Sequence, residues 1–201
     1  MFILWGRLNS HNVKKVAWAL AEAGLPHERR DIGGSFGYTP EYLAMNPNRL
    51  VPTLQEGSFS LYESNAILRY LAAAHAPRLH SADPHSRARG DMWMDWQFSY
   101  ADAQRALFLQ MVRVAPENRD GALIARSAQD TGRMMQILDA ELAQRPYLSG
   151  TDFGIADIAM GVYAHTWFSV DIPRPAVPHV SGWYQRLVAR PSFSAIAIPL
   201  S

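Results

Sequence analysis

The residue types best suited to chemistry gather around a proline at the start of a short apolar run. Pro52 follows Val51 and precedes Thr53-Leu54, a run typical of a strand. Because proline lacks a backbone N–H, it is tolerated at the beginning or the edge of a strand, so Pro52 marks a specialised turn. A cis Val51–Pro52 bond would let the neighbouring backbone groups face outward, toward a ligand.

An acid and a hydroxyl, Glu63 and Ser64, stand where the next helix is expected to begin. The start of a helix offers unpaired backbone donors and the positive end of the helix dipole, which together suit a bound carboxylate. The same two residues could act only as capping groups, a common role at helix starts. Their occurrence together with Pro52 favours ligand binding.

A second hydroxyl, that of Ser10, precedes another helical pattern and follows the turn Gly6-Arg7-Leu8-Asn9. Taken alone, Ser10 is most simply the residue that caps the helix. Three histidines, His75, His80 and His85, invite a metal site, but Pro77 and Pro84 interrupt any helix that would align them. We therefore expect solvated histidines there and no metal site.

The composition describes a globular chain without a basic face. The chain has 201 residues, 48% of them hydrophobic, and 19 basic against 18 acidic residues give a formal charge of +1. The mixed charges argue against nucleic-acid binding. No apolar run approaches the roughly 20 residues of a membrane span, and we expect a cytoplasmic protein. The chain has no cysteine, so any thiol chemistry must come from a ligand.

The elements that must position these residues fall into two groups. The first part of the chain predicts a βαβ unit followed by a ββα unit, with a glycine at the end of the first helix. Its expected strands are 2–5, 27–32, 53–55 and 59–61, and its main helices are 10–24 and 63–76.

The second part is helical in pattern throughout. Apolar residues recur at three- and four-residue steps in four successive segments, the first of them closed by Pro116. We expect an α+β protein, in which a thioredoxin-like βαβ-ββα domain precedes an all-α helical bundle. The expected boundaries are residues 1–76 for the first domain, 77–84 for a linker and 85–201 for the helical domain.

This order of elements resembles the cytosolic glutathione transferase family, in its serine-type and bacterial-like form, over essentially the whole chain. Five segments carry the resemblance. They are Asn46–Leu54 around the proline, Leu61–Leu71 at the second helix start, Ser10 with Val13, Lys15 and Val16, Phe153–Asp157, and Arg190–Phe193. Gly154 stands where the family usually has a Ser or Thr cap, and Arg49 where many members carry glycine.

The resemblance implies a site for glutathione as cosubstrate. Ser64 and its backbone N–H would hold the γ-glutamyl carboxylate, and Glu63 would anchor the γ-glutamyl amine. The backbone of Val51, presented by Pro52 and preceded by Leu50, would pair with the cysteinyl part of the peptide. Arg49 is the candidate for the glycyl carboxylate.

The resemblance also implies a group that favours the thiolate, because a free thiol has a pKa of about 8.5. In serine-type members a hydroxyl between the first strand and the first helix donates to the sulfur, and Ser10 is the matching position. Asn12 could donate instead through its amide and is the second candidate.

The function implied is that of a glutathione S-transferase, which conjugates the thiol to a small, apolar electrophile in detoxification. Two alternatives stay open: a glutathione-dependent disulfide reductase, and a non-catalytic binding or interaction module that keeps the fold. The family further implies a homodimer, with the long helices of the second domain in contact. The sequence does not identify the electrophile.

Overall fold

The computed structural model describes residues 1–200 and divides into two compact units. The sheet unit contains Met1–His80 together with Arg190–Ile198, and the helical unit contains Ser81–Ala189 with Pro199 and Leu200. This division differs at the C-terminal end from the sequence expectation, which assigned everything from residue 85 onward to the helical domain.

The sheet unit is built on four strands in the order β2-β1-β3-β4. Strand β1 (Phe2–Trp5) is parallel to β2 (His27–Arg30) and antiparallel to β3 (Thr53–Glu56), which forms a hairpin with β4 (Phe59–Tyr62). Trp5 lies opposite Thr53 in the β1–β3 register. The expected βαβ-ββα order is confirmed, and the site segment before Thr53 leads directly into the central antiparallel pair.

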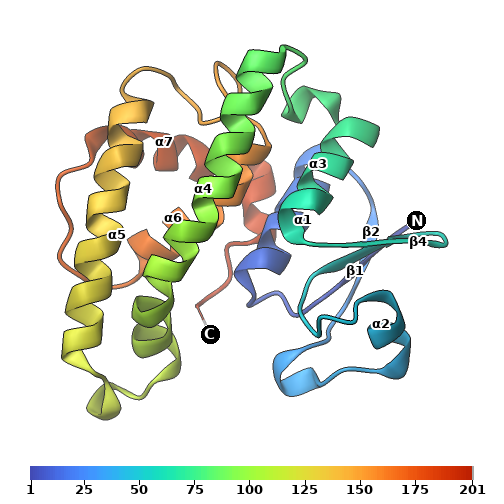
Figure 1. Ribbon diagram of the computed structural model, residues 1–201, viewed down its shortest axis with the longest axis horizontal. Helices are drawn as coiled ribbons and strands as arrows, with labels where there is room; N and C mark the ends of the chain where they lie inside the picture. The colour runs from blue at the N-terminus through green and yellow to red at the C-terminus, as the bar shows by residue number, and fades with distance from the viewer. Residues whose placement is uncertain (201) are drawn as a thin grey trace. The chain divides into compact units, whose positions relative to one another are not determined.

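Helices cover both faces of this sheet. Helices α1 (His11–Ala23) and α3 (Ser64–Ala74) pack together on one face, and the short α2 (Pro40–Met45) lies on the other (Figure 1). Successive side chains of a strand point to opposite faces of the sheet. Trp5 packs with Ile32 and Tyr42 in the core on the α2 face, and the fully buried Leu4 points to the opposite face, which α1 and α3 cover.

Helix α1 begins and ends as its sequence predicts. Ser10 is the N-cap residue, and Gly24 ends the helix with φ 67°, its N–H donating to the carbonyls of Leu20 and Ala21. A left-handed residue at this position favours glycine because it carries no Cβ. The apolar face between the two caps is buried, with α1 packed against α3, and the turn before Ser10 lies at the C-terminal end of β1.

The C-terminal segment packs on α1, which is why it belongs to the sheet unit. Trp18 Nε1 donates to Ser192 Oγ at 3.1 Å, and its ring lies edge-on to Phe193 with centroids 5.2 Å apart. Arg190 Nε donates to Glu22 Oε2 at 3.1 Å. These contacts join residues more than 160 positions apart, a relation that local sequence patterns do not carry.

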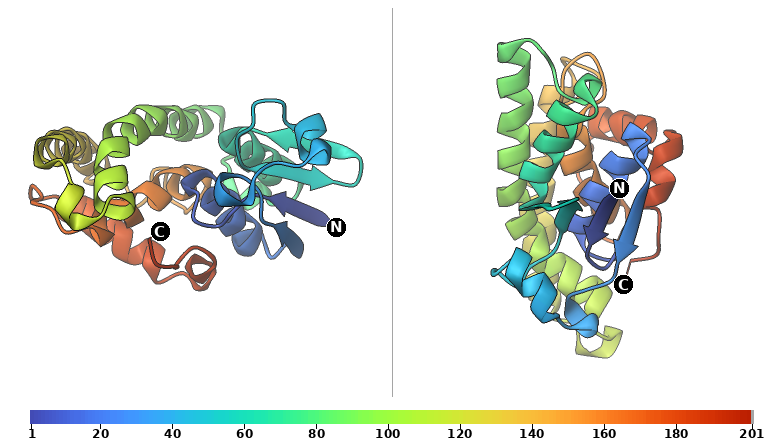
Figure 2. Two further views of the ribbon diagram at one scale, coloured as in Figure 1. Left: turned by 90° about the horizontal axis from the view of Figure 1, so that it is seen from below. Right: turned by 90° about the vertical axis from the view of Figure 1, so that its right-hand side faces the viewer.

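The helical unit contains α4 (Pro84–Phe108), α5 (Gly121–Leu142), α6 (Ile155–Ser169) and α7 (Pro178–Val188). Helices α4 and α5 lie side by side and are joined at one end by residues 109–120 (Figures 1 and 2). Helix α4 ends at Phe108 and continues in a π-helical turn, Leu109–Arg113, before the expected stop at Pro116. Within residues 1–200 we find no helix long and apolar enough to cross a membrane.

Candidate functional site

A small polar cavity in the sheet unit collects most of the residues that the sequence singled out. Its volume is about 30 Å³, and it is lined by Asn12, Asn46, Leu50, Val51, Pro52, Glu63 and Ser64. A water molecule needs roughly 10–15 Å³ on this measure, so the cavity can enclose a carboxylate or an amine but not a whole tripeptide. The remainder of such a ligand would lie along the surface outside it.

The segment that precedes β3 is held by hydrogen bonds from Tyr42 of α2 and from Asn46, the residue that caps the C-terminal end of α2. The Val51–Pro52 peptide is cis. The Leu50 carbonyl accepts from the hydroxyl of Tyr42 and from Asn46 Nδ2, the latter at 3.0 Å, and Asn46 Nδ2 also reaches Thr53 Oγ1 at 3.1 Å. Burial raises the pKa of the Tyr42 phenol, so it remains protonated as a donor. Leu50, Val51 and Pro52 are therefore held in one geometry.

The opening turn of α3 forms another wall. Glu63 is the N-cap residue with a positive φ of 68°, and Ser64, whose exposed fraction is 3%, is the first residue of the helix. Ser64 Oγ donates to Asn12 Oδ1 at 3.2 Å. The first backbone N–H groups of α3 thus begin at the cavity, where the dipole favours an anion.

Behind Ser64 lies a buried cation, Lys15. Its side chain is fully buried, and Nζ donates to Ser64 Oγ at 3.3 Å and to Asn65 Oδ1 at 3.1 Å. Burial lowers the pKa of Lys15 to about 7, and the nearby negative charge of Glu63 opposes that shift. Sequence reasoning used Lys15 only as part of a family resemblance. The available signal was a pair of lysines inside the apolar stretch of α1.

The two candidates for thiolate stabilisation occupy different places at the start of α1. Asn12 lines the cavity, and because its Oδ1 accepts from Ser64, its amide nitrogen is directed away from that hydroxyl. Ser10 is partly exposed and does not line the cavity among the residues described. Its hydroxyl makes no capping bond to α1 in the described chain, so capping does not account for the side chain.

Arg49 lies outside the cavity lining described here. It is exposed and adopts a positive φ of 56°, a conformation in which glycine is favoured. Its carbonyl accepts from the hydroxyl of Tyr38 at 2.5 Å. The structure therefore brings six of the predicted site residues together at one cavity: Asn12, Leu50, Val51, Pro52, Glu63 and Ser64. The other two lie next to lining residues in the chain, Ser10 two positions before Asn12 and Arg49 directly before Leu50.

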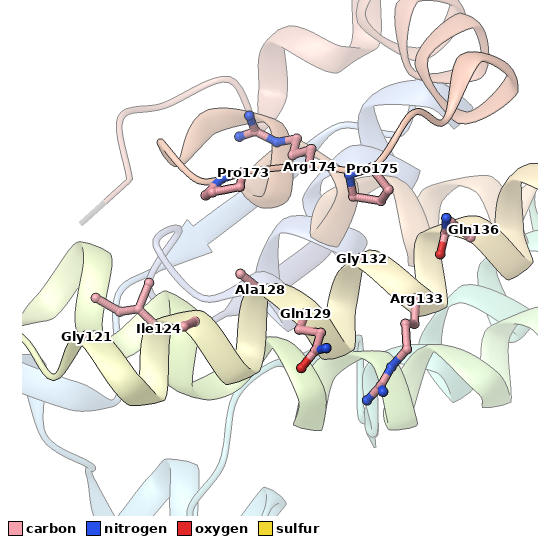
Figure 3. Close-up of a pocket in the computed structure, with 11 residues that line it drawn as sticks. Gly121, Ile124, Ala128, Gln129, Gly132, Arg133, Gln136, Pro173, Arg174 and Pro175 are labelled. Atoms are coloured by element: carbon pink, nitrogen blue, oxygen red, sulfur yellow. The ribbon is translucent and has the colours of Figure 1, made fainter.

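A larger cavity of about 490 Å³ lies in the helical unit, between α5 and Pro173–Pro175 (Figure 3). Ile124, Ala128 and Gly132 form its α5 wall. Figure 3 shows Arg133 pointing away from the proline side, and this side chain pairs with Asp130. Arg174 donates to the carbonyls of Trp167 and Val170. Arg133 and Arg174 are thus already bound to other groups of the protein, and the cavity offers mainly apolar contacts to a ligand.

Two family models match the chain: the glutathione S-transferase N-terminal domain over residues 4–79 and the C-terminal domain over residues 103–191. The chain is 42% identical to glutathione S-transferase GstB of Escherichia coli K12, covering all of both chains. A theta-class glutathione S-transferase from Xanthomonas axonopodis pv. citri, solved with glutathione bound, matches with a TM-score of 0.96 and 46% identity, covering 100% of this chain and 99% of that one. The disulfide-bond oxidoreductase YfcG of E. coli K12 is 30% identical, over 90% of this chain and 87% of its own.

Proposed function

The chain belongs to the glutathione S-transferase family, and from that premise we propose that its polar cavity holds the γ-glutamyl end of glutathione. The observation that carries this placement is the meeting of the α3 N-terminus, the buried Ser64 hydroxyl and the Val51–Pro52 segment at one cavity. The enzyme then presents the glutathione thiol, as a thiolate, to a small electrophile.

In this binding mode the Ser64 hydroxyl turns from Asn12 Oδ1 to donate to the γ-glutamyl carboxylate, which also accepts from backbone N–H groups of α3. The γ-glutamyl amine lies against Glu63, whose side chain borders the same cavity. The extended cysteinyl part pairs with the backbone of Val51, which Leu50 and Pro52 hold in place. These contacts are directional and charged, so they fix the peptide on the surface and leave its sulfur near the start of α1.

The thiolate is then stabilised by a donor at the start of α1, and Ser10 is our first candidate. A hydrogen bond to a charged acceptor contributes roughly 1.5–3 kcal/mol, which corresponds to about one to two pKa units of the thiol. The hydroxyl of Ser10 is not occupied by helix capping, which leaves it available for the sulfur. Asn12 stays the second candidate through its amide nitrogen.

Binding is tested by calorimetry with Glu63→Ala and Ser64→Ala. Each variant should bind glutathione about 10- to 100-fold more weakly, because a charged hydrogen bond at the γ-glutamyl end is lost. Glu41→Ala changes an exposed acid in the first turn of α2 and serves as the matched control. If both site variants bind glutathione as tightly as the wild type, the proposal that this cavity holds the γ-glutamyl end is refuted.

We further propose that the electrophile is small and apolar, that the reaction serves detoxification, and that the enzyme is a cytoplasmic homodimer. The homodimer proposal rests on family membership, and sedimentation at the mass of a single chain would refute it.

A panel of electrophiles of graded polarity tests the substrate class, and a preference for polar members would count against it. Cell fractionation tests the compartment, and recovery outside the cytoplasm would contradict it.

Disulfide reduction is a second candidate, favoured by the resemblance to YfcG, whose name is that of a disulfide-bond oxidoreductase. The chain has no cysteine, so glutathione would have to react with the disulfide directly. Turnover of a model aryl halide compared with turnover of a small mixed disulfide separates the two reactions. Binding of glutathione without turnover of either would indicate a non-catalytic module.

A further inference from the structure

Most arginines of the sheet unit are paired with acids, and Arg7 is not. Across residues 1–200, no ion pair links the Arg7 guanidinium to a carboxylate, although Arg7 is only partly exposed. The paired arginines are Arg29 with Asp31, Arg30 with Glu28, and Arg78 and Arg190 with Glu22. A half-buried cation without a counter-charge is a position where an anionic ligand gains binding energy.

Two glycines form a seat for the Arg7 side chain. Gly33 and Gly34 have φ values of 80° and 60°. A Cβ built on Gly34 would lie 3.0 Å from Arg7 Nε and 3.2 Å from its Cδ, and one built on Gly33 would lie 3.3 Å from Arg7 Nη1. Both the positive φ values and the close approach favour glycine, so the loop and the arginine fit each other. The backbone anchors the same turn through Arg7 N–H to the Ile32 carbonyl at 3.3 Å.

This seat adjoins the glutathione site through Val51. The Cβ position built on Gly33 lies 3.1 Å from Val51 Cγ1 and 3.3 Å from Tyr38 Oη. Val51 also lines the polar cavity, together with Glu63 and Ser64. A peptide that pairs with the backbone of Val51 and places its γ-glutamyl end at Ser64 therefore passes close to Arg7. Arg7 also precedes Ser10 in the same turn, so an electrophile approaching the sulfur comes near it as well.

We propose that Arg7 is a carboxylate-binding residue of this site, seated by Gly33 and Gly34 beside Val51. The inference rests on the glutathione placement proposed above. Two molecules can supply the carboxylate: glutathione, through its glycyl end, or an anionic electrophile, which would be an exception to the apolar substrate class proposed above. A guanidinium offers two parallel N–H donors to a carboxylate, an arrangement that a neutral ester or amide cannot match.

The glycyl source is tested by the affinities for S-methylglutathione and for its glycyl monoester, measured by calorimetry. The unreactive sulfur keeps thiol ionisation out of the result. If glutathione supplies the carboxylate, Arg7→Met should reduce the preference for the free acid over the ester about 10- to 100-fold. Arg30→Met, which removes a partly exposed arginine paired with Glu28, is the matched control and should leave that preference unchanged.

The electrophile source is tested with iodoacetate and iodoacetamide at saturating glutathione. In both reactions the thiolate sulfur forms a bond to the methylene carbon as the carbon–iodine bond breaks and iodide leaves. The two reagents have similar size and differ in charge. If the electrophile supplies the carboxylate, Arg7→Met should lower kcat/KM for iodoacetate about tenfold or more relative to iodoacetamide.

A fall in either ratio supports the proposal and identifies the source of the carboxylate. Both readouts are ratios within one variant, so a general loss of folded protein cancels. Wild-type binding of S-methylglutathione together with unchanged ratios in Arg7→Met would overturn the Arg7 assignment alone. A wild type that does not bind S-methylglutathione would overturn the proposed site itself, and with it this inference.

Discussion

Lys15 connects the packing of the sheet unit to the chemistry of the site. Its ammonium is fully buried behind Ser64 and donates to both Ser64 and Asn65. Burial disfavours the charged form, which is why its pKa falls to about 7 although Glu63 opposes the shift. The residue holds the first turn of α3 through these two bonds and contributes positive charge beneath the proposed γ-glutamyl carboxylate site, at a cost to the folded state near neutral pH.

That cost predicts a pH dependence of stability. The pKa of Lys15 is about 7 in the folded state against a reference value of 10.5, so between these values the unfolded state binds more protons. The free energy of unfolding should therefore rise with pH, by about 2 kcal/mol from pH 7 to pH 9. Burial also lowers the pKa of Lys14, so chemical denaturation should show a rise with pH in both proteins, larger in the wild type than in Lys15→Met by the contribution of Lys15. Parallel curves would contradict a lowered pKa at Lys15.

The sequence singled out residues that line the polar cavity, but not the residues Lys15 and Arg7 that lie behind and beside it. Pro52, Glu63 and Ser64 stand in short segments whose order and spacing are visible in the chain, and the structure places all three on one cavity. The burial of Lys15 depends on α3 packing against α1, and the seat of Arg7 depends on a loop that follows β2. Both are relations between separate segments, which local patterns do not encode.

Asp157 is the side chain on which the start of α6 depends. Its Oδ1 accepts from Leu148 N–H and from Trp183 Nε1, both at 2.8 Å. Its Oδ2 accepts from Ser149 N–H at 3.2 Å and from Gly154 N–H at 3.0 Å. Gly154 has no side chain to cap the helix, and the bond from its own N–H back to Asp157 completes the helix start.

Replacing Asp157 should therefore destabilise the helical unit. Asp157→Ala leaves buried donors without an acceptor, and we expect a loss of about 3 kcal/mol or more in the free energy of unfolding. Asp152→Ala, which changes an exposed acid in the same turn, should cost less than about 0.5 kcal/mol. Denaturant unfolding of both variants is the measurement. Equal stability of the two would show that the Asp157 bonds contribute little.

Elements with strong periodicity or clear caps were predicted well, and their ends less so. Strand β1 follows from a short apolar run, β3 and β4 follow from a hairpin signal between two short runs, and α1 follows from the Ser10 and Gly24 caps. The end of α4 did not follow, because Pro116 was the visible stop while the structure changes to a π-helical turn at Leu109. No proline or glycine stands at that change, so the sequence pattern carried no signal for it.

At the scale of the whole chain, the sheet unit is completed by a segment from the far end of the sequence. Glu22 on α1 accepts from Arg190, Ser192 and Arg78. Burial raises the pKa of Glu22, but the bonds from Arg190 and Ser192 outweigh burial and leave that pKa lowered. The first domain of this transferase therefore cannot be defined by an N-terminal range alone.

Glu22→Gln should weaken the attachment of the C-terminal segment Arg190–Ile198 to α1. Because the folded pKa of Glu22 is lowered, its contribution to stability is present above the unfolded pKa and lost as the pH falls through the folded value. We expect the variant to be about 1–2 kcal/mol less stable near neutral pH and to approach the wild type in acid. Urea unfolding at both pH values tests this, with Glu41→Gln, which changes an exposed acid in the first turn of α2, as control. A stability difference that does not change with pH would contradict the role of charge.

We propose that a donor at the start of α1 lowers the pKa of the thiol of bound glutathione, and that Ser10 is this donor. The most direct test is the titration of the thiolate absorbance of glutathione bound to the wild type, to Ser10→Ala and to Asn12→Ala. We predict a thiol pKa below the free value of about 8.5 in the wild type and in Asn12→Ala, and a rise of about one to two units in Ser10→Ala. A thiol pKa unchanged by Ser10→Ala would contradict the account.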